Sequence, residues 1–241
     1  MTTRAQRLRT MVAKHPPIYR AATLALEAQG FVRRRSQIRK YFASSSEFAG
    51  LQIGAGTHHL DGWLTTDLIP IQLQIVYMDA HKRFPFHDNT FDFVVAEHVI
   101  EHLTYRDATR MLDECHRVLG DKGVLRVSTP NMHLIHRLMS PPLTPALERY
   151  VSWSNRKFDG SCDPHSTAHV VNRLQHEWGH QFLYDADTLI AALEQCGFAE
   201  ITECNPNESG HSSLMNVDGH ADEIGEEFNE LESLIVEATK T

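Results

Sequence analysis

The sequence predicts an α/β protein built on a doubly wound, mostly parallel β-sheet, and three observations lead to this fold class. Short apolar segments typical of strands alternate with segments of helical period over much of the chain, which is the order of elements in a parallel sheet covered by helices. The first apolar segment runs directly into Gly54-Ala55-Gly56, a tight turn after a buried strand. Two later strand segments end at the carboxylates Asp67 and Asp79. Carboxyl ends of parallel strands meet at one edge, which is therefore predicted to bind a ligand.

Seven strands are predicted, each rich in β-branched or aromatic residues and bounded by turn residues. They cover residues 51–53, 63–67, 74–78, 91–95, 124–128, 199–204 and 231–238. The last two segments suit a closing antiparallel pair, so the last strand is expected to run against the others.

Helices are predicted between and before these strands. They cover residues 3–14, 18–29, 33–42, 105–119, 131–139, 186–196 and 222–232. Residues 105–119 show the clearest helical spacing, and Pro16-Pro17 separate the first two helices. Residues 141–180 contain prolines and lack clean periodicity, so we interpret them as an insertion that covers the substrate side of the site. The predicted organisation is a helical N-terminal extension over residues 1–45 and one domain over residues 46–241.

Composition restricts the class of protein. No run of about 18 apolar residues occurs, and the N-terminal segment has no apolar stretch followed by a small-residue cleavage site. The four cysteines, Cys115, Cys162, Cys196 and Cys204, show no Cys-x-x-Cys spacing. We therefore expect a cytoplasmic protein in a reducing compartment.

Charge is distributed unevenly along the chain. The net charge is −8, but residues 1–40 carry +9 and leave −17 on the remainder. One interpretation is that this basic segment docks on an anionic membrane or glycan precursor. We favour the other interpretation, in which it forms a solvated helical face or packs on the acidic remainder of the chain. Nucleic acid is not expected as a partner because no second basic surface is present. A homodimer is compatible with this charge pattern.

A set of motifs carries a resemblance to a known family. These are "LQIGAG", "TDL", "MDAHKRFPFHDNTFDFVV", "EHVIEHL", "ECHRVLGDKGVLRVSTPN" and, later in the chain, "WGHQFLYDADTLIAALEQCGF". Together they resemble class I S-adenosylmethionine-dependent methyltransferases, most of all a bacterial methyltransferase-11-like subgroup often found with glycan biosynthesis genes. The resemblance implies a Rossmann-like sheet, S-adenosyl-L-methionine as cofactor and transfer of a methyl group to a small molecule or glycan.

The resemblance also implies roles for individual residues. Gly54, Ala55 and Gly56 would pass the methionine moiety of the cofactor, Asp67 with Leu68 would bind the ribose hydroxyls, Asp79 and Ala80 would face the adenine, and Glu97 would line the methyl side. The chain departs from the family in two places: His58 replaces the third glycine of the first motif, and only 13 positions separate Gly54 from Asp67. The intervening helix is therefore expected to be short or absent. This spacing also argues against a nicotinamide site, which needs the full glycine motif and an acid about 20 residues on.

A hydroxyl acceptor is favoured. The chain has Glu97-His98-Val99-Ile100 where methyltransferases acting on nitrogen usually carry Asn/Asp-Pro-Pro-Tyr/Phe. A saccharide or similar hydroxyl needs a general base, and histidine can be neutral and basic at pH 7. The candidates are His98 or His102, then His133, with Glu101 able to orient a histidine.

Two other functions remain open. The altered first motif favours a catalytically silent binding or scaffold protein with the same fold. His176, Glu177 and His180 match the His-Glu-x-x-His pattern of zinc hydrolases. That pattern requires a stable helix, and Gly179 lies inside it, so zinc hydrolysis is disfavoured and no metal site is predicted.

Overall fold

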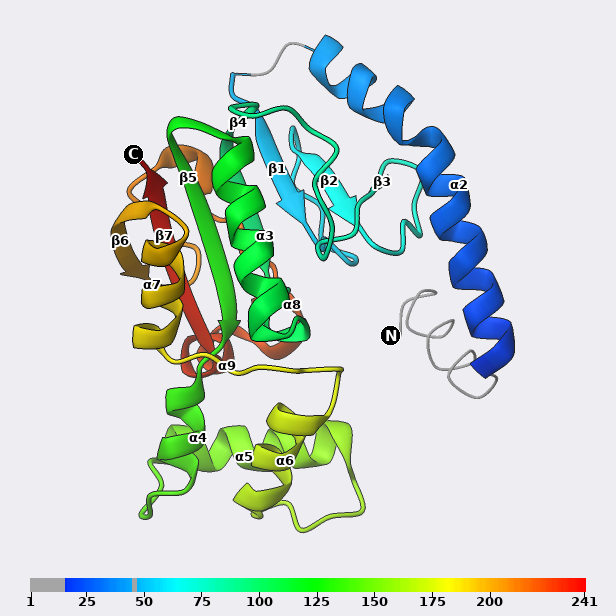
Figure 1. Ribbon diagram of the computed structural model, residues 1–241. Helices are drawn as coiled ribbons and strands as arrows, with labels where there is room; N and C mark the ends of the chain where they lie inside the picture. Colours follow the sequence, from blue (N-terminus) through cyan, green and yellow to red (C-terminus); the bar gives the residue numbers. More distant parts are fainter. Residues whose placement is uncertain (1–15, 45–46) are drawn as a thin grey trace.

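The computed structural model describes residues 16–44 and 47–241 (Figure 1). The predicted helix over residues 3–14 lies outside this part of the chain. At the centre is one seven-stranded sheet with strand order β3-β2-β1-β4-β5-β7-β6. The strands are β1 Gly50–Ile53, β2 Leu64–Asp67, β3 Val76–Tyr77, β4 Phe91–Glu97, β5 Leu119–Pro130, β6 Phe198–Cys204 and β7 Ser233–Lys240.

Strand pairing confirms the predicted fold class. β1 pairs in parallel with β2 and β4, β2 with β3, and β4 with β5, whereas β7 is antiparallel to β5 and β6. The strand order reverses between β1 and β4, and this switch point is where ligands bind in open α/β sheets. β5 is longer than predicted because the segment around Gly120 continues the strand instead of forming a turn.

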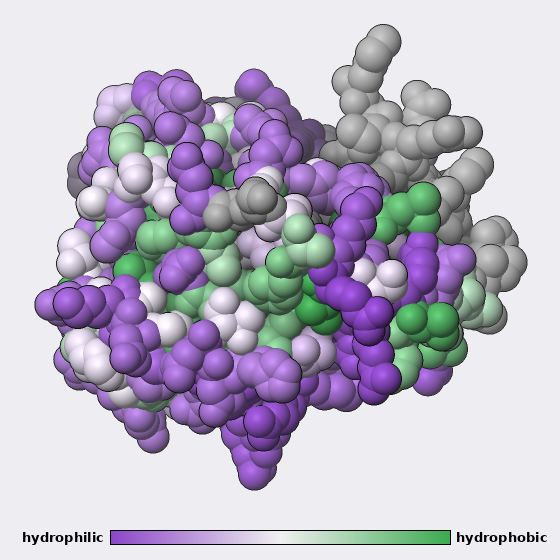
Figure 2. All heavy atoms as spheres, turned by 90° about the horizontal axis from the view of Figure 1, so that it is seen from above, coloured by the Kyte–Doolittle hydropathy of each residue, from purple (hydrophilic) through white to green (hydrophobic). Residues whose placement is uncertain are grey.

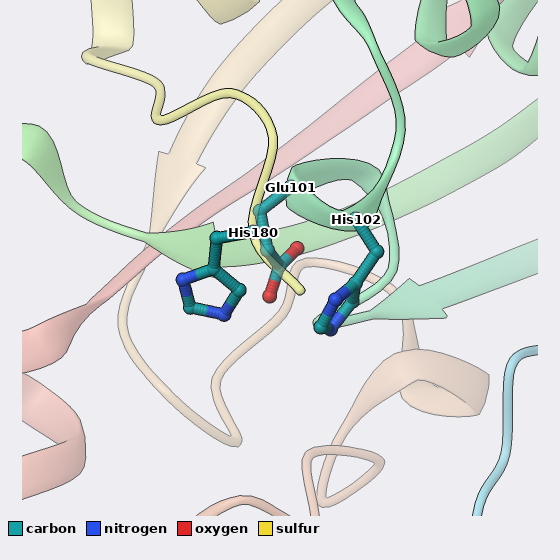
Figure 3. Close-up of side chains that lie close together, drawn as sticks. All are labelled: Glu101, His102 and His180. Atoms are coloured by element: carbon teal, nitrogen blue, oxygen red, sulfur yellow. The ribbon is translucent and has the colours of Figure 1, made fainter. Parts of the chain in front are cut away.

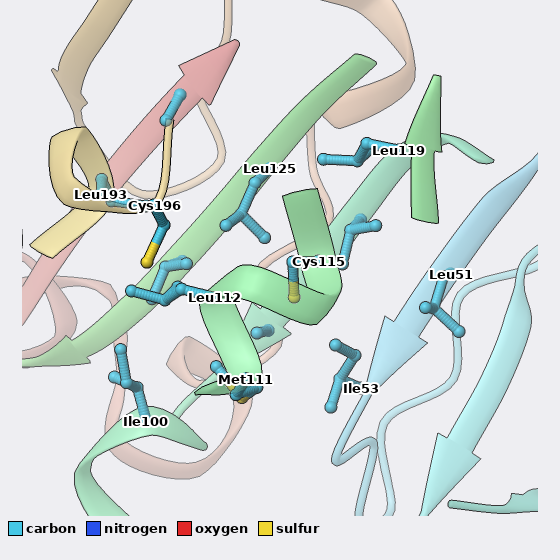
Figure 4. Close-up of a cluster of buried hydrophobic side chains, with 14 of the residues drawn as sticks. Leu51, Ile53, Ile100, Met111, Leu112, Cys115, Leu119, Leu125, Leu193 and Cys196 are labelled. Carbon is cyan, nitrogen blue, oxygen red and sulfur yellow. The ribbon is translucent and has the colours of Figure 1, made fainter. Parts of the chain in front are cut away.

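One face of the sheet is covered by helices α3 Tyr105–Val118 and α7 Ala186–Gln195, which lie in front of it in Figure 1. α3 begins where the Thr104 hydroxyl accepts a hydrogen bond from the Asp107 N–H, a normal N-cap. Its apolar stripe, with Met111 and Leu112 fully buried, packs against side chains of β1, β4 and β5 (Figure 4). This is the main hydrophobic core.

The opposite face has a different cover. Leu60 and Trp63 from the segment between β1 and β2, and Leu214 and Val217 from the segment after β6, pack on alternate residues of the same strands, such as Val95. The helical elements of these two segments are short: η2 Ser212–Leu214, α8 Ala221–Ile224 and α9 Glu226–Glu232. The helix after the glycine turn was expected to be short or absent, and residues 54–63 form turns without a helix.

The N-terminal part of the described chain is one helix, α2 Pro16–Ala43, so the prediction of two helices over residues 18–29 and 33–42 was wrong. Gly30, which lies between the two predicted helices, is part of this single helix, and the helix packs closely there. A Cβ on Gly30 would lie 2.7 Å from Pro70 Cγ and 2.8 Å from Tyr77 Cβ. Glycine therefore permits close contact between α2 and the β3 edge of the sheet.

The insertion is also helical, contrary to the expectation of an irregular segment. α4 Met132–Leu138, α5 Pro145–Phe158 and α6 Thr167–His176 form a lobe below the carboxyl ends of the strands in Figure 1. The lobe has its own small core, to which Leu147, Tyr150 and Val151 contribute from one face of α5. Prolines and polar aromatic residues around this stripe hid its helical period.

The acidic C-terminal segment forms two helices, α8 and α9 Glu226–Glu232, where one was predicted. Gly225, at φ +89°, separates them. None of the helices in the described ranges is long and apolar enough to cross a membrane.

Candidate functional site

The glycine turn at the end of β1 is shaped by two different requirements. Gly54 and Gly56 have φ of +66° and +55°, values that favour glycine. A Cβ on Gly54 would lie 2.4 Å from Val99 Cγ2, whereas a Cβ on Gly56 would meet nothing within 4 Å. Gly54 thus lets the turn contact the segment after β4, and Gly56, with Ala55 beside it, leaves open space for a ligand.

Asp67 ends β2 next to this turn. Its carboxylate accepts hydrogen bonds from the Gly56 N–H at 2.8 Å and the Ile69 N–H at 2.7 Å. The side chain is partly exposed, the following Leu68 is exposed, and a carboxylate has about four acceptor positions. Asp67 can therefore accept two further hydrogen bonds from a diol while it holds the glycine turn in place.

Asp79 and Ala80 follow β3 at the same edge, and the Met78 N–H donates to the Asp67 carbonyl. The Asp79 carboxylate contacts Lys82 Nζ at 2.7 Å and His81 Nδ1 at 3.0 Å. Burial opposes its charge, but these hydrogen bonds lower the pKa of Asp79 below its ordinary value. Asp79 is thus a carboxylate beside Asp67, although its present partners lie in its own turn.

Glu97 does not face the glycine turn with a free carboxylate. Its two oxygens accept from the backbone N–H groups of Gly219 at 3.1 Å and His220 at 2.9 Å. Both donors belong to the segment after β6, which also contacts His58. Glu97 therefore anchors that segment, a contact between residues 122 positions apart that no local pattern indicates.

His98 and Glu101 form a buried pair after β4. His98, in the left-handed region at φ +49°, lies with Nδ1 3.1 Å from Glu101 Oε1 and with its ring 4.0 Å from that of His220. Burial opposes the charged forms of both, but their mutual attraction raises the pKa of His98 and lowers that of Glu101. The Thr129 hydroxyl also donates to Glu101, at 3.3 Å.

Glu101 lies between the rings of His102 and His180 (Figure 3). Their ring centroids are 5.0 Å apart, and both side chains are partly exposed, whereas Glu101 is fully buried. Burial lowers the pKa of His102 below its ordinary value despite the nearby carboxylate. The structure therefore joins three predicted residues, His98, Glu101 and His102, and adds His180, which had been considered only as part of the zinc-hydrolase pattern.

His133 lies apart from this group. It is an exposed residue of α4, and its backbone N–H donates to the Asn131 side chain that caps the helix. The His-Glu-x-x-His pattern is not helical either, because α6 ends at His176 and Trp178 and Gly179 adopt positive φ. His176 and His180 therefore do not share a helix face.

A hollow of about 470 Å³ lies at the opposite edge of the sheet, lined by Phe48, Asp92, Phe93 and Lys122 among others. Figure 2, which looks onto the molecule from above, shows hydrophobic side chains gathered near the middle of that face and hydrophilic ones around them. The motif residues that line this hollow, such as Asp92 and Lys122, lie near the amino ends of β4 and β5, whereas the glycine turn, Asp67 and Asp79 lie at the carboxyl ends. The carboxyl edge therefore remains the candidate site.

Comparison with known proteins identifies one segment of the chain with a family. Residues 51–127 match the family model described as a methyltransferase domain. An uncharacterized protein of Methanocaldococcus jannaschii is 34% identical over 110 residues, which are 40% of this chain and 47% of that protein. The chain thus spans about half the length of this curated relative.

Solved structures with a similar arrangement are more distant. A methyltransferase of Archaeoglobus fulgidus has a TM-score of 0.48 at 16% identity, covering 85% of this chain and 92% of that one. One of Thermotoga maritima has a TM-score of 0.46 at 16% identity, covering 89% and 94%. Phosphoethanolamine N-methyltransferase 2 of Haemonchus contortus, solved with S-adenosylhomocysteine, has a TM-score of 0.42 at 12% identity, covering 86% and 52%.

The matched segment runs from β1 through most of β5 and contains the glycine turn, Asp67, Asp79 and the His98–Glu101 pair. The sheet is mostly parallel with an antiparallel last strand, as predicted. Residues 51–127 thus match a methyltransferase domain, in agreement with the family resemblance of the sequence motifs.

Proposed function

We propose that the chain binds S-adenosyl-L-methionine at the carboxyl edge of β1, β2 and β3 and transfers its methyl group to a hydroxyl of a saccharide or similar polar molecule. The observation that carries this proposal is the contact between Asp67 and Gly56. One carboxylate holds the turn that opens toward a ligand and keeps acceptor positions for the ribose diol.

The cofactor supplies a methyl group on a positively charged sulfur. An acceptor oxygen forms a bond to the methyl carbon, the carbon–sulfur bond breaks, and its electron pair stays on sulfur. The protein aligns the two molecules, which supplies much of the rate. An imidazole, His98 or His102, takes the hydroxyl proton.

The position of the histidines supports this assignment. Val99 packs against Gly54, so the segment that carries His98, Glu101 and His102 lies directly beside the cofactor turn. The lobe of α4, α5 and α6 lies at the same edge (Figure 1), where it is suited to contact the acceptor. Exposed Met132 and Trp178 are in this lobe.

The test is calorimetric titration of the chain with S-adenosylmethionine and S-adenosylhomocysteine. We expect micromolar affinity, about −8 kcal/mol, and a loss of at least about tenfold in Asp67→Ala. The matched control is Asp121→Ala, an exposed carboxylate at the other edge of the sheet, which should bind like the unaltered chain. Absence of binding to either compound would leave the scaffold role as the better account.

Acceptors are then screened by mass spectrometry for a mass gain of one methylene on simple saccharides. Methylation only of amines would contradict the hydroxyl assignment.

A further inference from the structure

Glu101, His102 and His180 each offer one potential ligand atom, and these atoms all lie within 4.8 Å of one another (Figure 3). Glu101 and His102 end the short helix η1 Ile100–His102, and His180 comes from the segment that leads from α6 back to the sheet. We propose that these three side chains bind a divalent first-row transition metal ion.

Hydrogen bonds to neighbouring residues orient His180 and Glu101 for metal binding. His180 Nδ1 donates to the Leu174 carbonyl at 2.7 Å, which leaves Nε2 with a free lone pair. Metal-binding histidines commonly donate their other ring N–H to a carbonyl or carboxylate in this way. Glu101 is held by His98 and Thr129, and its remaining acceptor positions are available to an ion.

The backbone fixes His180 beside η1. The N–H groups of Gln181 and Phe182 both donate to the Glu101 carbonyl, at 2.7 and 3.2 Å. Just before them, Trp178 and Gly179 have φ of +57° and +87°. A large side chain rarely adopts this conformation unless its surroundings impose it. This turn therefore brings His180 next to His102, although 78 positions separate the two residues in the chain.

The ligand set indicates the kind of ion. Two imidazoles and one carboxylate suit zinc, manganese or iron, whereas magnesium and calcium prefer oxygen ligands alone. Ligand atoms about 2.1 Å from zinc lie about 3.4 Å apart in a tetrahedron, and the potential ligand atoms lie within 4.8 Å of one another, so their separations must shorten by at most about 1.4 Å. The partly exposed rings of His102 and His180 can rotate to do so. Three protein ligands leave a position for water or an acceptor oxygen.

The ion would lie beside the cofactor turn. Bound to the acceptor hydroxyl, it would lower the pKa of that hydroxyl and hold its oxygen toward the methyl group, an extension that rests on the proposed function. His102 would then be a ligand, and the ion would take over the activation assigned above to an imidazole.

Metal binding can be measured without turnover. After dialysis against chelator, the full chain is titrated with Co²⁺, whose visible absorption reports imidazole coordination, and with Zn²⁺ by calorimetry. We expect one ion per chain, and at least about tenfold weaker binding in His180→Ala and in His102→Ala. The matched control is His176→Ala, an exposed histidine of the same segment, which should leave the affinity unchanged.

A second group, Asp159, Cys162 and His169, has similar spacing but lies in the lobe and serves as another control through Cys162→Ser. Tight binding that survives His180→Ala, or that disappears in Cys162→Ser, would overturn the assignment. Circular dichroism of each variant checks folding. Titration with S-adenosylhomocysteine separates the two proposals: metal binding without cofactor binding refutes the proposed function alone, and cofactor binding without metal binding refutes this inference alone.

Discussion

The two faces of the sheet are stabilised by different interactions. The face under α3 and α7 is apolar, with Leu51, Met111 and Leu112 among its fully buried side chains. The other face buries a charged group: Arg126, 1% exposed, binds Asp218 at 2.5 Å and Glu237 at 2.6 Å.

The difference follows from what covers each face. A helix satisfies its own backbone, so its buried stripe can be purely apolar, whereas irregular segments bring unpaired carbonyls and N–H groups that need partners. Arg126 donates to the carbonyls of Asn205 and Glu208, and Gln52 bonds to the backbone of His58 and Leu60. Polar side chains on this face thus replace the hydrogen bonds of missing helices.

Removing Arg126 should have the largest effect on stability. Arg126→Ala leaves two buried carboxylates without their partner, and we expect a loss of about 4 kcal/mol in the free energy of unfolding. Urea denaturation followed by circular dichroism measures it. The control is Arg110→Ala, which breaks the exposed pair with Asp107 and should cost less than about 1 kcal/mol. Equal losses would mean that the buried network contributes no more than a surface pair.

A cavity in the helical face should cost somewhat less. Leu112→Ala removes a fully buried side chain of α3, and we expect a loss of about 3 kcal/mol from lost burial and cavity formation. Leu73→Ala, at a residue 75% exposed, is the control and should change little in the same urea experiment. A small effect of Leu112→Ala would show that α3 repacks, and the contrast between the faces would then weaken.

The smallest effect on stability should come from the packing between the two segments that cover the second face, the one between β1 and β2 and the one after β6. A Cβ on Gly219 would lie 2.4 Å from the His58 ring, whereas one on Gly210 in the same segment meets nothing within 4 Å. Gly219→Ala should therefore cost about 2 kcal/mol through overpacking, and Gly210→Ala should be nearly neutral. Thermal unfolding of both variants checks this, and identical midpoints would show that the segment moves away from His58 without penalty.

The same contrast explains how much of the fold the sequence predicted. All seven strands and α3, α4 and α7 were placed within a few residues, because periodicity reports burial against a regular partner. The cover of the second face had no such period. Trp63, Leu214 and Val217 meet only after the chain has folded. The continuity of α2 through Gly30 was missed as well, and the close contacts of Gly30 lie in another part of the chain.

The candidate site, too, was predicted where its residues follow a local pattern and missed where they meet through long-range contacts. The glycine turn, Asp67, Asp79 and the His98–Glu101 pair lie at strand ends in one continuous stretch, so their common edge could be inferred. The partners of Glu97 could not, because Gly219 and His220 reach it from the end of the chain. His180 was visible only within a helical motif that does not form, and its actual neighbours are Glu101 and His102.

The lobe leaves the sheet and returns to it at a single point. Asn131 pairs with Tyr184, and the Met132 N–H donates to the Tyr184 carbonyl at 2.8 Å. Residues 132–183, called the cassette below, therefore begin and end at neighbouring positions, and within them the Tyr150 hydroxyl donates to Glu232 and the Gln181 N–H donates to the Glu101 carbonyl. His180 lies inside this cassette, whereas Glu101 and His102 lie outside it, in η1. An exchange of this segment would thus replace the surface suited to the acceptor and the proposed third metal ligand in one step.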